Sequence, residues 1–224
     1  DFVNKAAADR SDTINTCIGC NQACLDHTFS GKLTTCLVNP RACYETELNY
    51  IPTTTIKKIA VVGAGPAGLA AATVAAERGH QVTLFDSSSE IGGQFNIAKR
   101  VPGKEEFFET LRYFKSKLQS TGVDVRLNTR VSAADLLAGG FDEIILATGI
   151  APRTPDIPGI DHPMVISYID AILQRKPVGQ HVAVIGAGGI GFDVSEFITH
   201  NGLSTSLDRE AFWREWGIDL ALEA

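Results

Sequence analysis

The sequence lacks the features that would place it in a membrane or on a nucleic acid. No run of about 18 apolar residues occurs among its 224 residues, so no segment is expected to span a bilayer. Residues 1–16 are polar and lack the apolar centre of a signal peptide. The net charge is −6, and Lys and Arg form no cluster suited to phosphates. We therefore expect a cytoplasmic protein, in a compartment where thiols stay reduced.

Cysteine is missing from the whole chain after residue 43, although five cysteines occur before that point. Cysteines that fill a core would be scattered, so this clustering needs a chemical cause. Four follow the pattern Cys17-x2-Cys20-x3-Cys24-x11-Cys36, which suits a zinc ion or an iron–sulfur cluster. Three close thiolates and a distant fourth favour a 4Fe-4S cluster, whereas structural zinc more often uses paired knuckles. The remaining Cys43 is expected to be a packed thiol.

From residue 56 onward, short apolar runs alternate with helical patterns. The apolar runs predict parallel strands at 58–62, 81–85, 124–127, 143–147 and 181–185. The helical patterns cover 66–78 and 105–121, and each stops at a glycine. The sequence therefore predicts an α/β protein with a Rossmann-like fold, preceded by a small irregular cysteine-rich lobe.

A first glycine loop, GxGxxG, lies directly after a strand and at the start of a helix. Gly63 would make the tight turn, Gly65 would let a pyrophosphate approach the backbone, and Gly68 would allow close helix–strand packing. Asp86 ends the next strand, where an acid can bind the ribose of an adenine dinucleotide. Glycines that serve packing only are the alternative. The pattern alone does not distinguish FAD from NAD.

A second glycine loop follows the run at 181–185. Gly186, Gly188 and Gly191 repeat the spacing of the first loop, with Gly189 between them. A separate nicotinamide dinucleotide, NADPH or NADH, is its expected occupant. The choice between the two depends on a further strand, which the sequence does not display.

Further residues point to a flavin in the first site. The first loop, with Asp86 and the segment 91–94, looks like flavoproteins that bind two dinucleotides and hold FAD in the first site. The segment 147–149 resembles their second FAD contact. This resemblance implies that further residues bind FAD, namely Pro66, Ala67, Gly92, Gly93, Gln94, Thr148 and Gly149.

The resemblance extends over most of the chain. Segments 16–24, 36–40, 91–99, 102–107, 152–155 and 159–163 resemble the family of bacterial NADPH-dependent 2,4-dienoyl-CoA reductases. Trimethylamine dehydrogenase and NADH-dependent enoate reductases share that architecture. The resemblance implies that electrons pass from NADPH to FAD, then through a 4Fe-4S cluster to FMN, which reduces the dienoyl-CoA of fatty acid β-oxidation. FMN and substrate would lie in an N-terminal (β/α)8 barrel that this chain lacks.

The resemblance also divides the chain into three parts. We expect an iron–sulfur cluster segment at 1–50, an FAD-binding domain at 56–175 without its final segment, and a truncated NAD(P)H-binding domain at 176–224. The chain is thus expected to be an inactive fragment of an oxidoreductase. An FAD-free fragment and a zinc-stabilised NAD-binding interaction module are the alternatives. The five histidines show no pairing, so no catalytic residue is expected.

Overall fold

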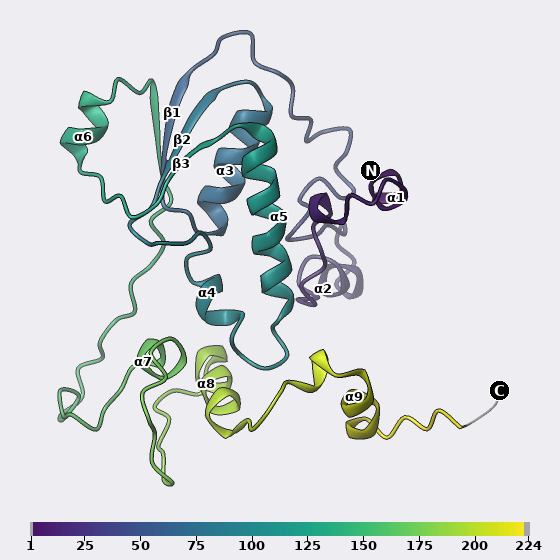
Figure 1. The fold of residues 1–224 in the computed structure, drawn as a ribbon, viewed down its shortest axis with the longest axis vertical. Helices are drawn as coiled ribbons and strands as arrows, with labels where there is room; N and C mark the ends of the chain where they lie inside the picture. Colours follow the sequence, from purple (N-terminus) through teal and green to yellow (C-terminus); the bar gives the residue numbers. More distant parts are fainter. Residues whose placement is uncertain (1, 222–224) are drawn as a thin grey trace. The chain divides into compact units, whose positions relative to one another are not determined.

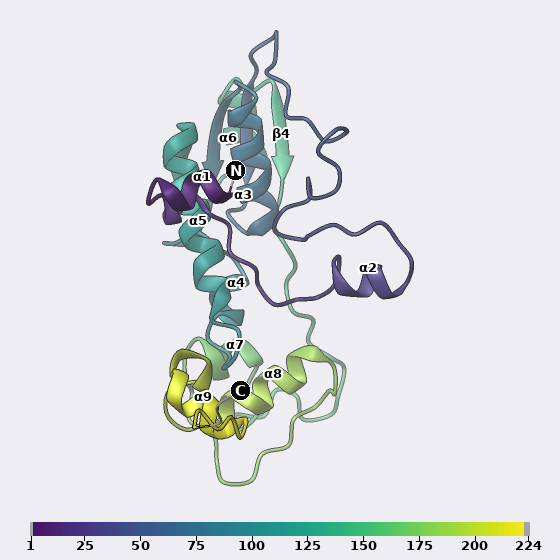
Figure 2. The same cartoon turned by 90° about the vertical axis from the view of Figure 1, so that its right-hand side faces the viewer.

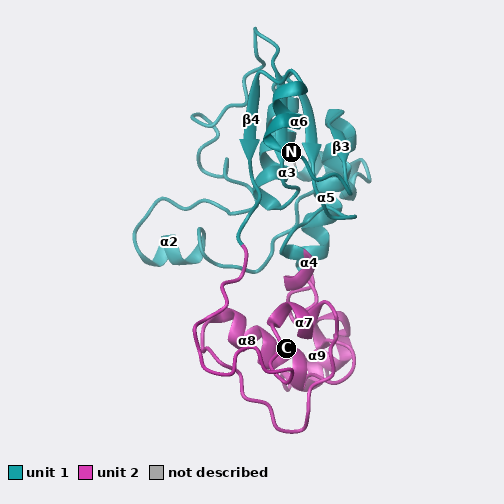
Figure 3. Cartoon of the chain, turned by 90° about the vertical axis from the view of Figure 1, so that its left-hand side faces the viewer, with its two compact units in different colours: residues 1–95, 106–150 teal, residues 96–105, 151–224 magenta. Residues whose placement is uncertain are grey.

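The computed structural model describes residues 2–221, and the chain divides into two compact units. Unit 1 comprises residues 1–95 and 106–150, and unit 2 comprises residues 96–105 and 151–224 (Figure 3). The three-part division expected from the sequence stays a prediction. Across residues 2–221, no helix has both the length and the apolar content needed to cross a membrane.

A parallel sheet forms the centre of unit 1 (Figure 1). Its strands are β1 (Lys58–Val62), β2 (Gln81–Phe85), β3 (Asp124–Arg126) and β4 (Glu143–Leu146). Their order is β3-β2-β1-β4, and Ile59 of β1 lies opposite Val82 of β2 and Glu143 of β4. The predicted Rossmann-like α/β fold is therefore confirmed. The first two strands have the predicted bounds, and the other two each end one residue earlier.

Alternate side chains of β1 enter two separate cores, because successive residues of a strand point to opposite faces of the sheet. Ile59 and Val61 pack with Leu84 of β2, and also with Leu69 and Leu118 of the helices on that face. On the other face, a smaller cluster contains Ala60, Phe85 and Leu136. Both faces of the central strands β1 and β2 are thus covered, as their continuous apolar runs predict, whereas Leu146 of β4 is 72% exposed.

Three helices of unit 1 supply these covering side chains, with α3 and α5 on one face and α6 on the other (Figures 1 and 2). They are α3 (Pro66–Glu77), α5 (Glu106–Thr121) and α6 (Ala133–Ala138). Proline at the first position of α3 is pre-set for a helix start. Gly79 and Gly122 follow α3 and α5 in left-handed backbone conformations, with φ of 97° and 71°, which are easy only for glycine.

The N-terminal lobe has little regular structure, as expected. It contains α1 (Phe2–Ala7), a 3-10 turn η1 (Ser11–Thr13) and α2 (Leu25–Phe29). Hydrogen bonds cross-link it, among them one from Asn15 Nδ2 to the Val38 carbonyl at 2.7 Å and one from the Thr35 N–H to the Ala23 carbonyl at 2.8 Å. The segment around Cys36 is thereby tied back to the segments around the other cysteines.

Unit 2 contains helices but no strand within its described residues. Its elements are α4 (Phe95–Ala98, beginning in unit 1), α7 (Tyr168–Ile172), α8 (Gly189–Thr199), η2 (Thr205–Leu207) and α9 (Arg209–Glu215). The prediction of a strand at 181–185 is wrong. No neighbouring strand among residues 2–221 pairs with it, and Ile185 is 78% exposed. An apolar run becomes a strand only where a partner strand accepts its backbone hydrogen bonds.

Candidate dinucleotide sites and cysteine lobe

The first glycine loop has a backbone that tolerates no side chain at two positions. Gly63 has φ of 109°, and a Cβ there would lie 2.2 Å from the Ala147 carbonyl oxygen. A Cβ on Gly68 would lie 1.8 Å from the Gly63 carbonyl oxygen. Gly65 differs, because its φ is −75° and a Cβ would have only the Gly93 Cα as a neighbour, at 4.0 Å. The fold therefore requires glycine at positions 63 and 68, whereas packing does not require it at position 65.

Asp86, the acid at the end of β2, lies against this loop. Its Oδ2 accepts a hydrogen bond from the Ala64 N–H at 2.6 Å, and its Oδ1 accepts one from the Ser88 N–H at 2.7 Å. Both bonds are short because the acceptor is charged. Asp86 is half-buried, and each carboxylate oxygen can accept a second bond. The carboxylate thus orients the loop and can also accept bonds from ligand hydroxyls.

The Gly92–Gly93 segment also lies on the loop. The Gly92 N–H donates to the Ala64 carbonyl at 2.8 Å, and a Cβ on Gly93 would lie 3.0 Å from the Gly65 Cα. Both glycines have positive φ, 122° and 53°. Glycine is needed here because two backbones approach closely while one of them turns in the left-handed region.

A fourth segment comes from the end of β4. The carbonyl of Ala147 lies next to Gly63, and Gly149 has φ of 73°. Gln94 Nε2 donates to the Ile150 carbonyl at 3.2 Å, so the side chain of Gln94 bridges the third and fourth segments. The strand order turns back between β1 and β4, and ligands of open α/β sheets bind at such switch points, beyond the carboxyl ends of the strands.

The structure therefore brings together most of the residues predicted for the first site. The loop, Asp86, the segment 92–94 and the segment 147–149 meet at one edge of the sheet. Pro66 and Ala67 form the first turn of α3, where free N–H groups and the helix dipole favour an anion. The assignment of these residues to FAD stays a prediction.

The second glycine loop, in unit 2, repeats the local backbone of the first. Gly186 has φ of 118°, and a Cβ on Gly191 would lie 2.0 Å from the Gly186 carbonyl oxygen. Gly188 caps α8 with φ and ψ of −85° and −179°, close to −75° and 178° at the cap of α3. Gly189 has open space beside it. Two separate sequence segments thus form the same strained turn at the start of a helix.

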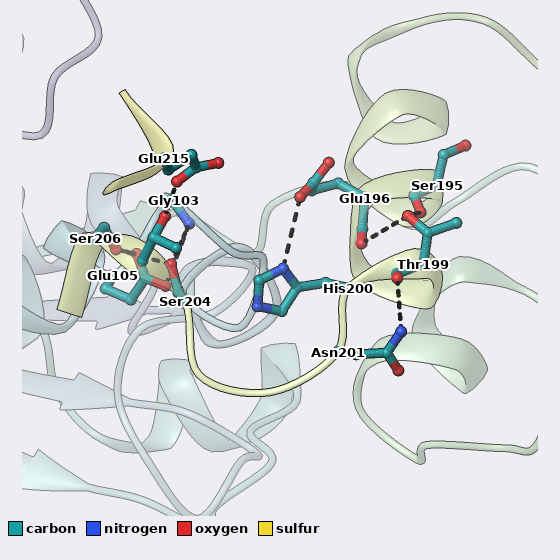
Figure 4. Close-up of polar contacts among 11 residues, drawn as sticks. Gly103, Glu105, Ser195, Glu196, Thr199, His200, Asn201, Ser204, Ser206 and Glu215 are labelled. Carbon is teal, nitrogen blue, oxygen red and sulfur yellow. Dashed lines mark hydrogen bonds and ion pairs between the residues drawn. The ribbon is translucent and has the colours of Figure 1, made fainter. Parts of the chain in front are cut away.

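Polar contacts tie the segment after α8 to Gly103 and Glu105 (Figure 4). A further contact, from Lys104, ties α8 near its start to the same residues 103–105. Lys104 Nζ binds both carboxylate oxygens of Asp193 at 2.6 Å. Glu105 accepts hydrogen bonds from Ser206 Oγ at 2.7 Å and from the Gly103 N–H at 3.2 Å. Burial raises the pKa of Glu105, but the bonds from Ser206, Ser204 and the backbone together lower it below 4.5. Glu105 is thus held as a carboxylate.

The cysteines predicted as metal ligands are all free thiols within the N-terminal lobe. Cys17 is exposed, and Cys20, Cys24 and Cys36 are half-buried. Cys17 Sγ accepts a hydrogen bond from the Gly19 N–H at 3.4 Å, a contact typical of thiolate ligands. The donor chemistry fits a thiolate-bound metal group. However, among residues 2–221 no three Cys, His, Asp or Glu side chains are arranged to hold a metal ion, so the ligand set stays a prediction.

Two polar residues that hold the N-terminal lobe together, or hold it to helix α5, were not predicted. Arg112 of α5 donates to the carbonyls of Ser11 and Ile14 at 2.9 and 3.0 Å, and Asn15 reaches Val38. The sequence offers one weak signal, since Asn15 lies two residues before Cys17. Nothing in the helical pattern singles out Arg112.

The fold and the first site define a dinucleotide-binding protein of the Rossmann-like type. The family comparison is more specific. The chain belongs to the pyridine nucleotide-disulphide oxidoreductase family, whose model matches residues 57–210. This relationship supports the binding of FAD and of a nicotinamide cofactor.

Curated relatives and solved structures agree with this assignment. The chain is 38% identical over 211 residues to a metal reductase of Desulforamulus reducens, covering 92% of this chain and 31% of the relative. It is 34% identical over 205 residues to a cinnamate reductase of Clostridium sporogenes, covering 91% and 30%. A 2-naphthoyl-CoA reductase complex has a TM-score of 0.83 at 30% identity, covering 96% of this chain and 34% of that one. The chain thus spans about a third of the length of these proteins.

Proposed function

We propose that this chain is the reductase and electron-transfer portion of an iron–sulfur flavoenzyme that accepts electrons from NADPH or NADH. The observation that carries this proposal is the pair of glycine loops with one backbone geometry, of which the first is surrounded by three further segments. Two dinucleotide sites in one chain suit a reaction between two dinucleotides. The family relationship favours FAD as one of them.

In the first site, the absence of a side chain at Gly65 would let the pyrophosphate approach the backbone, and the N–H groups at the start of α3 would bind it. Asp86 binds the ribose hydroxyls. The segments at 92–94 and 148–149 hold the flavin end. When bound, FAD supplies the conversion between hydride transfer and single-electron transfer. The protein residues bind and orient the cofactor, and none is needed to move a proton.

In the second site, the pyrophosphate of the nicotinamide cofactor would bind in the same manner to the loop that contains Gly186, Gly188, Gly189 and Gly191. The cluster of contacts around Lys104 and Asp193 fixes the start of α8, on which this loop depends.

In the N-terminal lobe, Cys17, Cys20, Cys24 and Cys36 would hold a 4Fe-4S cluster, which carries single electrons. Zinc in the same thiolate set is the alternative, and it would make the lobe a purely structural module. An FAD-free, non-catalytic chain is the second alternative.

The acceptor would be an FMN in a separate barrel, where a carbon–carbon double bond conjugated to a thioester is reduced. The resemblance to 2,4-dienoyl-CoA reductases favours a 2,4-dienoyl-CoA. The names of two similar proteins, a cinnamate reductase and a 2-naphthoyl-CoA reductase, agree with a conjugated carboxyl or thioester substrate. The dienoyl-CoA would thus be a partner only through the barrel.

The visible spectrum of the anaerobically purified chain, with its iron, zinc and sulfide contents, tests this proposal. Flavin bands with a broad shoulder at about 400 nm and with iron are the expected result. Flavin with zinc alone would refute the cluster. A colourless protein that takes up no added FAD would refute the whole assignment.

A further inference from the structure

We propose that Arg112 is a positioning residue that fixes the cysteine lobe against the dinucleotide-binding sheet of unit 1. This inference rests on the proposed cluster function and adds to it a residue outside the ligand set. Arg112 lies on α5, whose opposite side packs on the sheet through Leu118. The chain from residue 11 to residue 16 runs beside this helix (Figure 1).

The guanidinium of Arg112 uses both of its terminal nitrogens on this chain. Nη1 donates to the Ser11 carbonyl at 2.9 Å, and Nη2 donates to the Ile14 carbonyl at 3.0 Å, with a weaker contact to Thr16 Oγ1 at 3.5 Å. Nε is held by Glu109 Oε2 at 2.6 Å, which fixes the plane of the group. A planar fork with five donors can make these contacts together, and a lysine cannot.

Neighbouring contacts connect the segment that Arg112 holds with the surroundings of two predicted ligands, Cys17 and Cys36. Ser116, one turn along α5, donates to Asp12 Oδ2 at 2.7 Å. Asn15 links the same chain to Val38, two residues after Cys36. The segment that Arg112 holds also ends one residue before Cys17. Loss of the fork should therefore release both ends of the cysteine lobe while leaving the sheet and the glycine loop unchanged.

Amide hydrogen exchange on the purified chain, loaded with FAD and anaerobically reconstituted with iron and sulfide, tests the proposal. Arg112→Met should raise exchange at residues 11–16 at least about tenfold, because charge-assisted bonds to two carbonyls are lost there. Arg112→Lys should restore only part of the protection. Lys115→Met removes a cation from an exposed position of the same helix and is the matched control. FAD content should equal that of the wild type in all three.

The electron paramagnetic resonance spectrum of the reduced, loaded chain gives a second readout. Its line shape should change in Arg112→Met and remain that of the wild type in Lys115→Met. Equal exchange in these two variants would overturn the proposal, and so would faster exchange throughout α3 and β1 in Arg112→Lys. If the wild type takes up no cluster, the proposed function is refuted, yet the exchange measurement still decides the role of Arg112.

Discussion

Gly65 allows cofactor binding to be separated from folding. Its φ of −75° is open to any residue, and a Cβ would have only the Gly93 Cα as a neighbour, at 4.0 Å. Gly65→Val should therefore cost the fold only about 1 kcal/mol, the usual scale for an unfavourable residue at a helix N-cap. By contrast, the same valine would occupy the proposed pyrophosphate position. We expect FAD affinity to fall at least about 100-fold, or roughly 2.8 kcal/mol.

Gly68 provides the opposite case in the same loop. A Cβ there would lie 1.8 Å from the Gly63 carbonyl oxygen, so the start of α3 must move away from β1. Gly68→Ala should destabilise the fold by about 1–3 kcal/mol or more, as overpacking does. Gly179→Val is the control for Gly65→Val, since a side chain at position 179 has open space and the backbone there is unstrained.

Two measurements distinguish these variants. Urea unfolding without cofactor gives the stability of each, and titration with FAD, followed by flavin fluorescence, gives the affinity. Gly65→Val should unfold near the wild type and bind poorly. Wild-type FAD affinity in folded Gly65→Val would show that the pyrophosphate does not lie on this loop, and the assignment of the first site would be wrong.

Three further predictions concern the other parts of the chain. Gly191→Ala should distort the second loop, because its Cβ would lie 2.0 Å from the Gly186 carbonyl oxygen, and faster amide exchange in α8 than in the control Gly189→Ala would confirm this. Cys20→Ser should remove the absorbance at about 400 nm while leaving FAD content unchanged; retention of that band would exclude Cys20 as a ligand. Because the folded pKa of Glu105 is lowered, its contribution to stability is present above pH 4.5 and lost as the pH falls through that pKa. In Glu105→Gln, the free energy of unfolding of unit 2 should therefore fall less steeply as the pH drops below 4.5. The same acid dependence as in the wild type would contradict the role of the Glu105 hydrogen bonds.

Local patterns predicted unit 1 well because each pattern coincides with a tertiary partner. The runs at 58–62 and 81–85 became paired strands, and their flanking glycines became the left-handed turns expected of them. The run at 181–185 is similarly apolar to that at 58–62 and is followed by a loop with the same glycine spacing, yet it forms no strand. A strand forms only when two segments pair, and the pattern within one segment does not show whether a partner segment lies beside it.

The candidate sites show the same limit at the level of side chains. Glycine spacing predicted the strained turns, because the positive φ of Gly63 and the close approach of Gly68 to the Gly63 carbonyl both arise within one loop. It could not predict that Asp86 would accept a bond from Ala64, or that Arg112 would reach the carbonyl of Ser11. Cysteine spacing gives the lengths of the intervening loops but not the directions of the thiols. The lobe is therefore brought together by Asn15 and by backbone bonds that the sequence does not reveal.

The selectivity of the two loops must lie outside their glycines, because both loops share one backbone geometry. At the first loop, Asp86 places a carboxylate 2.6 Å from the Ala64 N–H, at the end of β2. In the proposed first site, Asp86 would accept hydrogen bonds from the ribose hydroxyls and would repel a phosphate attached to the ribose. We therefore expect a cofactor with an unmodified adenosine ribose, such as FAD, to be favoured there over NADPH. At the second loop, the described residues after α8 lead into η2, and Asp193 of α8 is paired with Lys104. On the proposed assignment, the glycines of both loops would form a common phosphate-binding turn, and Asp86 at the end of β2 would give the first loop its preference.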